Sequence, residues 1–184
     1  MYLVRVVIKM SNDLWRTPQE VFDTLNVEFN FVADMASSYE NALCNVFFTE
    51  AQDSLSFEWS KKLPSKSLQY VWLNCPYSDP MPWVKQSLSA QSNGLGVVML
   101  LNSDTSVGWF AEALKGVSEI RYVIADEDFD TWRDYTSGRI NFLGKDGEPG
   151  KQNNKPQFVL IFNPFKIGAR VTSYITKKEL YGYK

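Results

Sequence analysis

A continuous apolar run over residues 96–101 constrains the fold of this chain more than any other segment. Such a run, without polar alternation, is typical of a strand that is covered on both faces, as in a parallel sheet. Tyr70–Leu73 and residues 120–125 are further short segments rich in strand-forming residues. These runs predict an α/β protein with a mostly parallel sheet.

Helical patterns separate the expected strands. Thr17 is expected to act as an N-cap and Pro18 to open the first helix. The expected helices cover residues 17–26, 37–48, 82–91 and 106–115, and the remaining expected strands cover residues 3–8, 29–33, 139–143 and 157–162. We interpret residues 49–64 as irregular. The last two strands, joined by the Gly- and Lys-rich stretch 144–156, are expected to end the sheet as a β-hairpin.

The chain length predicts one compact domain over residues 1–184, because 184 residues leave little room for a second one. The composition, 45 % hydrophobic and 22 % charged, is ordinary for a soluble globular chain. No apolar run is long enough to span a membrane, and the first residues do not resemble a signal peptide. We therefore expect a cytoplasmic protein with no membrane partner. A monomer or a homodimer is expected, and no sequence feature selects between them.

The sequence contains no histidine and only two cysteines, Cys44 and Cys75. This excludes hydrolases built on a Ser-His or Cys-His pair, since their general base is absent. It also excludes the usual zinc spacings and makes a disulfide framework unexpected, so we expect no metal. Direct methyl transfer from a sulfonium is compatible with this composition, because it needs little acid–base catalysis.

Positive charge is concentrated near the end of the chain. Residues 145–184 carry seven Lys and one Arg against three acids, within a chain of net charge −2. A basic C-terminal portion on an acidic body suits a surface that binds a polyanion, although a solvated tail would have the same composition.

The segment Asn74-Cys75-Pro76-Tyr77 carries the most specific chemistry. An aromatic amine is a poor nucleophile, because its lone pair is delocalised into the ring. Acceptors that hold its two hydrogens, here the Asn74 side-chain oxygen and the backbone carbonyl of Cys75, let the lone pair turn toward a methyl group. Tyr77 would stack on the base, which must leave the duplex to be reached. The same four residues would also suit a strand end followed by a turn.

The tetrapeptide is similar to the (Asp/Asn/Ser)-Pro-Pro-(Tyr/Phe/Trp) motif of amino-methyltransferases, and the chain as a whole resembles the phage-type DNA N-6-adenine methyltransferase (Dam) family. The resemblance covers roughly residues 12–165 and rests on the order of several motifs. They are Trp-Arg-Thr-Pro at 15–18, Asp-Met-Ala-Ser at 34–37, Glu-Asn-Ala at 40–42, Phe-Phe-Thr-Glu at 47–50, Asp-Ser-Leu at 53–55, Trp59, Trp83, the run at 104–110 and Gly-Arg-Ile-Asn-Phe-Leu at 138–143.

The resemblance implies a Rossmann-like, S-adenosylmethionine-dependent methyltransferase fold and methylation of the N6 amino group of adenine in DNA, expected to be double-stranded. It implies a catalytic set of Asn74, Cys75, Pro76 and Tyr77. It implies a cofactor site of Trp15, Thr17, Pro18, Asp34, Ala36, Asn41 and Asp53. Within this site Asp34 would accept from the cofactor ammonium, and Asp53 would bind its ribose or its adenine amine. Ser78, Lys151 and Lys155 are expected to contact DNA.

Two departures from the family pattern are visible. Ala36-Ser37 stands where the methyltransferase superfamily usually has a Gly-rich turn, and Cys75 replaces the first Pro of the tetrapeptide. Cys75 can still supply its backbone carbonyl, because a residue that precedes proline is already biased toward extended conformations. An RNA adenine methyltransferase, a protein glutamine amide methyltransferase and a non-catalytic DNA-binding relative remain alternatives.

Overall fold

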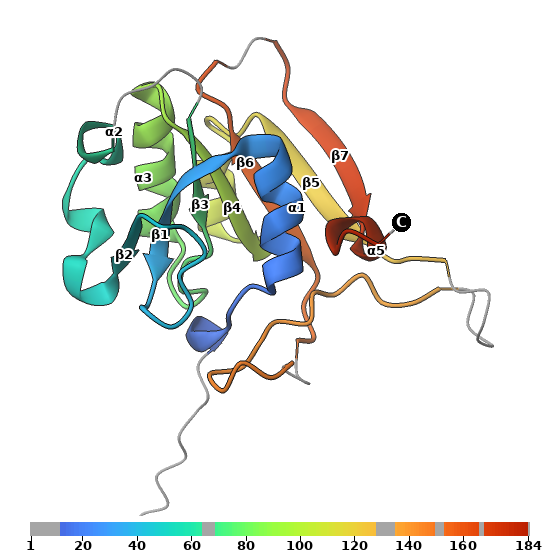
Figure 1. Cartoon of the computed structure of the whole chain (residues 1–184). Coiled ribbons are helices and arrows are strands. Elements are labelled where there is room, and N and C mark those ends of the chain that lie inside the picture. Colours follow the sequence, from blue (N-terminus) through green and yellow to red (C-terminus); the bar gives the residue numbers. More distant parts are fainter. Residues whose placement is uncertain (1–11, 64–68, 128–134, 150–152, 166–167, 184) are drawn as a thin grey trace, which may run out of the picture.

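A computed structural model describes residues 12–63, 69–127, 135–149, 153–165 and 168–183. The strand expected over residues 3–8 lies outside these ranges. The described elements form one seven-stranded sheet with helices on both faces (Figure 1). None of the described helices is long and apolar enough to cross a membrane.

The strands follow the order β2-β1-β3-β4-β6-β5-β7 across the sheet. They are β1 (Phe31–Ser37), β2 (Phe47–Thr49), β3 (Tyr70–Leu73), β4 (Gly96–Asn102), β5 (Glu119–Ile124), β6 (Gln157–Phe162) and β7 (Val171–Thr176). All run in one direction except β6, which lies antiparallel between β4 and β5. The predicted α/β fold with a mostly parallel sheet is therefore confirmed.

Two groups of helices cover the two faces. The helices are α1 (Gln19–Phe29), α2 (Trp59–Lys62), α3 (Met81–Ser92), α4 (Gly108–Ala113) and α5 (Lys177–Leu180), with short 3-10 turns η1 (Asn12–Leu14), η2 (Glu50–Gln52) and η3 (Ser54–Ser56). Apolar residues of α1 and α5 pack in one core cluster, and those of α2, α3 and α4 pack in the other. In Figure 1, α1 lies in front of the sheet.

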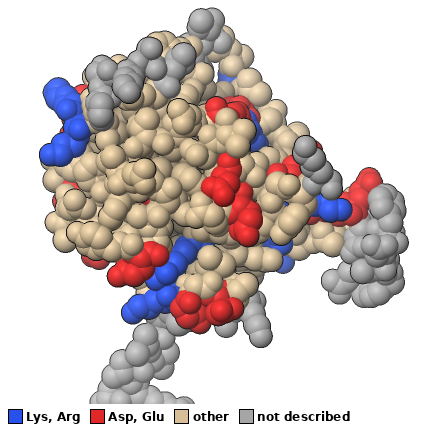
Figure 2. All heavy atoms as spheres, in the orientation of Figure 1, with Lys and Arg blue, Asp and Glu red and all other residues tan. Residues whose placement is uncertain are grey.

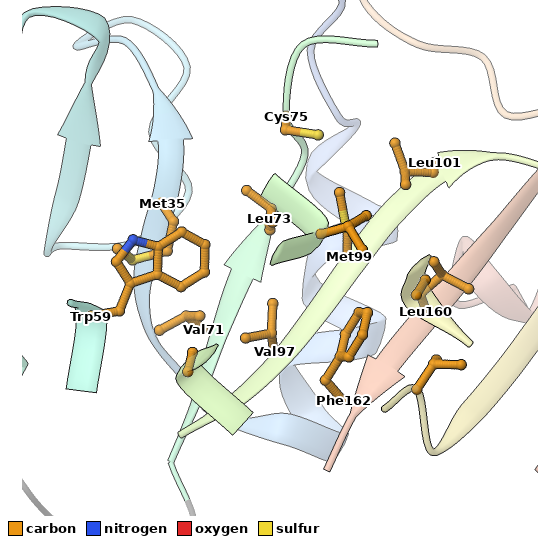
Figure 3. Packing of buried hydrophobic residues seen from close by; sticks show 14 of the residues in the cluster. Met35, Trp59, Val71, Leu73, Cys75, Val97, Met99, Leu101, Leu160 and Phe162 are labelled. Atoms are coloured by element: carbon orange, nitrogen blue, oxygen red, sulfur yellow. The ribbon is translucent and has the colours of Figure 1, made fainter. Parts of the chain in front are cut away.

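The packing of β4 explains why residues 96–101 are apolar throughout. Val97, Met99 and Leu101 belong to one cluster, whereas Val98 and Leu100 belong to the other, and all five are at most 1 % exposed. Side chains alternate between the faces of a strand, so a strand covered on both faces needs apolar residues at every position. Figure 3 shows the first of these clusters, with side chains of β1, β3, β4 and β6 packed around Trp59 and Phe162.

The topology creates a crevice beside β1. β2 pairs with one edge of β1 and β3 with the other, and α3 then leads the chain from β3 to β4. Because the connections leave β1 and β3 in opposite directions, the carboxyl ends of these strands border an open position, where α/β sheets bind ligands. Asp34 of β1 is aligned with Trp72 of β3, two residues before Asn74.

The prediction of a helix over residues 37–48 was wrong. This segment forms a loop and then β2, because side chains take the backbone N–H groups that a helix would use. The N–H of Ser38 donates to Asn41 Oδ1, and the N–H of Leu43 donates to Asp34 Oδ2 at 3.2 Å. Polar side chains that bind nearby backbone groups compete with helix formation.

The first helix begins later than expected and ends at Phe29 rather than residue 26. Its N-cap position is Pro18, with no side-chain cap, so the expectation that Thr17 caps this helix was also wrong. The expected strand at residues 29–33 is displaced, and β1 runs instead from Phe31 to Ser37. Residues 49–63, expected to be irregular, contain η2, η3 and the single turn of α2.

The expected pairing of residues 139–143 with Gln157–Phe162 was wrong. Residues 139–143 form no strand, and Leu143 makes only isolated bridges, to Arg16 and Pro149. The antiparallel neighbours of β6 are β4 and β5, so β6 pairs with β5, across a long connection, and not with residues 139–143. The last strand of the sheet, β7, was not predicted.

Candidate active site

A cavity of about 820 Å³ opens at the carboxyl ends of β1, β2 and β3. Its volume lies within the range of small-molecule sites. Of the residues expected at the cofactor and catalytic sites, the cavity is lined by Trp15, Thr17, Asp34, Ala36, Asn41, Asp53, Asn74 and Pro76. Pro18, Cys75, Tyr77, Ser78 and Lys155 do not line it. Lys151 lies outside the described residues.

Asp34 places a buried carboxylate in the cavity. The side chain is 2 % exposed and accepts the N–H groups of Ala36 at 3.3 Å and Leu43 at 3.2 Å. Burial raises the pKa of Asp34 from 3.8 to about 6, although these two hydrogen bonds act in the opposite direction. The described chain offers this carboxylate no cationic partner, so the site favours a cationic ligand.

Two hydroxyl groups in the cavity wall have no partner. Thr17 Oγ1 and Ser37 Oγ are buried and make no hydrogen bond within the described structure. Buried polar atoms are nearly always paired, so unpaired ones in a cavity wall indicate where a polar ligand binds. Thr17 therefore supplies a free hydroxyl at the cavity rather than a helix cap.

Asn41 and Asp53 lie in the loops on either side of β2. Asn41 accepts from Ser38 and shapes the β1–β2 loop. Asp53 adopts the left-handed conformation, with φ of 41°, between η2 and η3. This conformation is uncommon for a residue other than glycine. Its carboxylate, exposed at the cavity, has no hydrogen-bond partner in the described structure.

Residues 12–18, which we term the strap, connect this cavity with the tetrapeptide. Asn74 donates its side-chain Nδ2–H to the carbonyl of Trp15 at 3.4 Å, and Asp13 accepts the N–H of Ser78 at 2.9 Å. The first contact orients the Asn74 amide and leaves Oδ1 without a partner in the described structure. That oxygen is the acceptor that the tetrapeptide motif predicts for the target amine.

The strap is also held from its other side. Arg16 and Leu143 exchange two backbone hydrogen bonds of 2.9 Å. The buried ring of Phe142 stacks on Trp15, with centroids 5.4 Å apart, and meets Tyr77 edge-on at 6.1 Å. In Figure 1 the blue strap and the orange segment around residue 142 lie side by side. Phe142 thus contacts both Trp15, which lines the cavity, and Tyr77 of the tetrapeptide.

The Cys75 side chain and the Tyr77 hydroxyl are buried, which the tetrapeptide sequence alone does not indicate. The Tyr77 hydroxyl is buried without a partner, and burial raises its pKa well above the usual value. The Cys75 side chain packs in the core with Leu73, as Figure 3 shows, and burial raises the pKa of its thiol far above the usual range. A protonated, enclosed thiol is a poor nucleophile, so the side chain of Cys75 is structural. Burial likewise raises the pKa of Cys44 to about 12.

Two of the described basic residues of the C-terminal portion lie at opposite edges of the sheet. Arg170 binds the carbonyls of Leu114 and Val117 at the amino end of β5. Lys155 lies at the other edge, near Asp104, whose pKa is lowered mainly by hydrogen bonds from Ser106 and to a smaller extent by the charge of Lys155. Figure 2 shows Lys and Arg interspersed with acids over the visible face. The described residues contain no group of three or more His, Cys, Asp or Glu that could hold a metal ion.

Several site residues were missed by sequence reasoning. Trp83, Phe48, Glu50, Ser54 and Lys145 line the cavity, and Phe142 supports it from behind. The motif Gly-Arg-Ile-Asn-Phe-Leu contained a signal for Phe142, but we interpreted the segment as a strand. No local pattern indicates that Lys145 lies across the cavity from β1, because that contact joins residues more than a hundred positions apart.

The chain is similar in sequence to known proteins over most of its length. The sequence model of the DNA N-6-adenine-methyltransferase (Dam) family matches residues 6–183. The DNA N-6-adenine-methyltransferase of Escherichia phage T1 is 36 % identical over 170 residues, which cover 89 % of this chain and 68 % of that protein. The DNA N-6-adenine-methyltransferase of Haemophilus phage HP1 (strain HP1c1) is 33 % identical over 177 residues, covering 94 % of this chain and 91 % of that protein. No solved structure gives a significant match. The chain belongs to the DNA N-6-adenine-methyltransferase (Dam) family.

Proposed function

We propose that this chain transfers the methyl group of S-adenosylmethionine to the N6 amino group of adenine in duplex DNA. The observation that carries the proposal is the anchored amide of Asn74, which lies at the end of β3 beside a cavity containing a buried carboxylate. The amide can orient an amine, and the cavity can hold a cationic methyl donor next to it.

The residues of the cavity fit S-adenosylmethionine. Asp34 would pair with the ammonium of its methionine portion in a charge-assisted contact. The unpaired hydroxyls of Thr17 and Ser37 would bind polar atoms of the same ligand, and Trp15 would cover its methionine end. Asp53 would accept from the ribose or from the adenine amine. When bound, this donor supplies an electrophilic methyl group on a sulfonium.

The target adenine is held by the tetrapeptide. Asn74 Oδ1 and the backbone carbonyl of Cys75 would accept the two N–H groups of the amine, so that its lone pair points toward the cavity. Tyr77 would stack on the flipped base with its ring rather than bind it with its buried hydroxyl. Pro76 lines the cavity and limits the conformations of Cys75. No step requires a histidine, and the chain has none.

Transfer of tritium from methyl-labelled S-adenosylmethionine tests the proposal. We expect label in unmethylated duplex DNA and in the N6 position of adenine after digestion, but not in RNA or protein. We expect Asn74→Ala to abolish transfer and to keep the dissociation constant for S-adenosylmethionine within a few-fold, because the amide contacts the amine and not the donor. Labelling of RNA or protein alone would contradict the proposal, as would full turnover by Asn74→Ala.

A further inference from the structure

A second hollow, of about 420 Å³, lies beyond the carboxyl end of β5. It is lined by Val123 and Ala125 at the end of that strand, by Thr136, Ser137 and Arg139 of the following segment, and by Pro156. β5 and β3 run in the same direction, so this hollow and Asn74 lie at the same edge of the sheet.

The walls of this hollow are polar and include Arg139, a cationic side chain without a partner in the described structure. Arg139 is exposed, and its guanidinium has no ion-pair or hydrogen-bond partner anywhere in the described structure. Ser137 Oγ accepts the N–H of Arg139 at 3.3 Å, so the hydroxyl proton is available to another acceptor. Asp126 is engaged, since its Oδ1 accepts the N–H of Lys178 at 2.9 Å.

The backbone beneath Arg139 is held firmly. A side chain at Gly138 would come within 2.4 Å of the backbone of Ile124, so the segment passes directly against β5. Ile140 is fully buried, donates its N–H to Gln157 Oε1 at 3.1 Å, and accepts from Asn153 Nδ2 at 2.8 Å. An arginine on such a support loses little backbone freedom when it binds a ligand.

Arg139 lies within reach of nucleotides that flank the target base. It precedes Phe142 by three residues, whose Cα atoms can span at most roughly 10 Å. The ring of Phe142 is 6.1 Å from that of Tyr77, on which the adenine would stack. The two steps together span at most roughly 16 Å, and successive phosphates of one strand advance about 3.4 Å along the duplex axis, so this span corresponds to roughly five nucleotides.

We propose that Arg139, with the hydroxyl groups of Thr136 and Ser137, binds a backbone phosphate of the DNA within about five nucleotides of the flipped adenine. The inference rests on the proposed function, because the position of the base at Tyr77 defines the distance. Arg139 then sets the position of the strand without reading its sequence.

Arg139→Gln tests this site, with Arg139→Lys to retain the charge. Lys115→Gln is the matched control, because it removes one exposed cation at the end of α4, just before β5 begins at the opposite edge. The measurement is the affinity for a short unmethylated duplex by fluorescence anisotropy at several salt concentrations, together with the S-adenosylmethionine affinity by calorimetry.

We expect Arg139→Gln to weaken duplex binding several-fold and to flatten the slope of log K against log salt by about 0.9, the value for one phosphate. Arg139→Lys should retain the slope, Lys115→Gln should match the parent, and cofactor affinity should be unchanged in all three. An unchanged slope in Arg139→Gln would overturn the inference, and so would loss of binding in Arg139→Lys with an altered sequence preference, which would indicate base reading. A parent that methylates DNA while Arg139→Gln binds it normally would refute this site alone. A parent that methylates no DNA would refute the proposed function.

Discussion

Asp34 is the residue at which folding and ligand binding make opposite demands. Its pKa is about 6 in the folded chain and 3.8 in the unfolded chain, so the fold favours the neutral acid. The resulting cost is absent below pH 4, grows as the pH rises from 4 to 6, and is on the order of 3 kcal/mol above pH 6. A bound ammonium offsets this cost, because it pairs with the carboxylate.

Asp34→Asn should therefore separate stability from binding. We expect the ligand-free variant to gain about 1–3 kcal/mol in the free energy of unfolding at pH 7.5 and to gain little at pH 4, because only the ionised carboxylate is penalised. We expect its dissociation constant for S-adenosylmethionine to rise at least tenfold, because the charge-assisted contact is lost. Urea unfolding and calorimetry measure the two quantities.

The pH dependence supplies a second readout for the same residue. In the parent chain the affinity for S-adenosylmethionine should fall as the pH drops through about 6, because protonation of Asp34 removes its negative charge. The affinity of Asp34→Asn should show no such step. The exposed Asp23→Asn on α1 is the matched control and should bind as the parent does. A parent affinity that stays constant between pH 7.5 and 5 would rule out this role for Asp34.

The Tyr77 hydroxyl leads to a second prediction at this scale. Because it is buried without a partner, its removal in Tyr77→Phe should raise the free energy of unfolding by about 1 kcal/mol while turnover stays close to that of the parent. Tyr77→Ala should weaken the binding free energy of the flipped base by about 1–3 kcal/mol, the range for stacking on an aromatic ring. Thermal unfolding and steady-state kinetics check both variants, and a loss of turnover in Tyr77→Phe would assign a chemical role to the hydroxyl.

At the scale of elements, residues 139–143 join parts of the chain that no helix or strand connects. Their inward side chains include Phe142, and their backbone groups bind the strap, Gln157 and Asn153. On the outer side the N–H of Asn141 donates to the hydroxyl of Tyr181 at 3.0 Å. The segment therefore fixes the strap against the sheet, although it is not a strand itself.

Phe142→Leu should affect both halves of the site at once. Without the ring, Trp15 and Tyr77 lose their common support, so we expect a several-fold weaker affinity for S-adenosylmethionine and a similar loss in kcat. Phe158→Leu, in the opposite core cluster, is the matched control, since both rings are at most 1 % exposed and both variants should lose comparable stability. If both variants have equal kinetic constants at equal loss of stability, Phe142 is only a core residue.

The elements that the sequence predicted well are those with a local signal. Residues 70–73, 96–101 and 158–162 lack charged or amide side chains because both faces are covered, and all three ranges lie in strands. β7 was missed because it is an edge strand with mostly exposed or half-buried residues, so it has no apolar run. Asn74 was recognised as a site candidate from the chemistry of its tetrapeptide, and Asp34 from the order of the motifs around it. Phe142 and Gln157 depend on long-range contacts that no periodicity encodes.

At the scale of the whole molecule, the sheet has one edge for ligands and one for connections. The cavity, the tetrapeptide and the hollow beside Arg139 all lie at the carboxyl ends of the strands. At the amino ends the chain is held by contacts among connections, such as those of Gln91 Nε2 with the carbonyls of Gly116 and Asn163, both at 2.9 Å. The two edges are separated by the length of the buried strands, so a ligand at one edge has no direct contact with the other.

Hydrogen exchange should show this division when the cofactor product S-adenosylhomocysteine is added. We expect slower exchange in the strap and the β1–β2 loop, including the N–H groups of Arg16, Ala36 and Leu43, because the ligand stabilises the groups to which they are bonded. The N–H groups of Ser118 and Val171, at the amino edge, should exchange at unchanged rates. The melting temperature should rise with ligand concentration as RT ln(1 + [L]/Kd) requires. If the ligand slowed exchange equally at both edges, it would act only by lowering the population of the globally unfolded chain. That result would contradict local stabilisation of the carboxyl edge by the ligand.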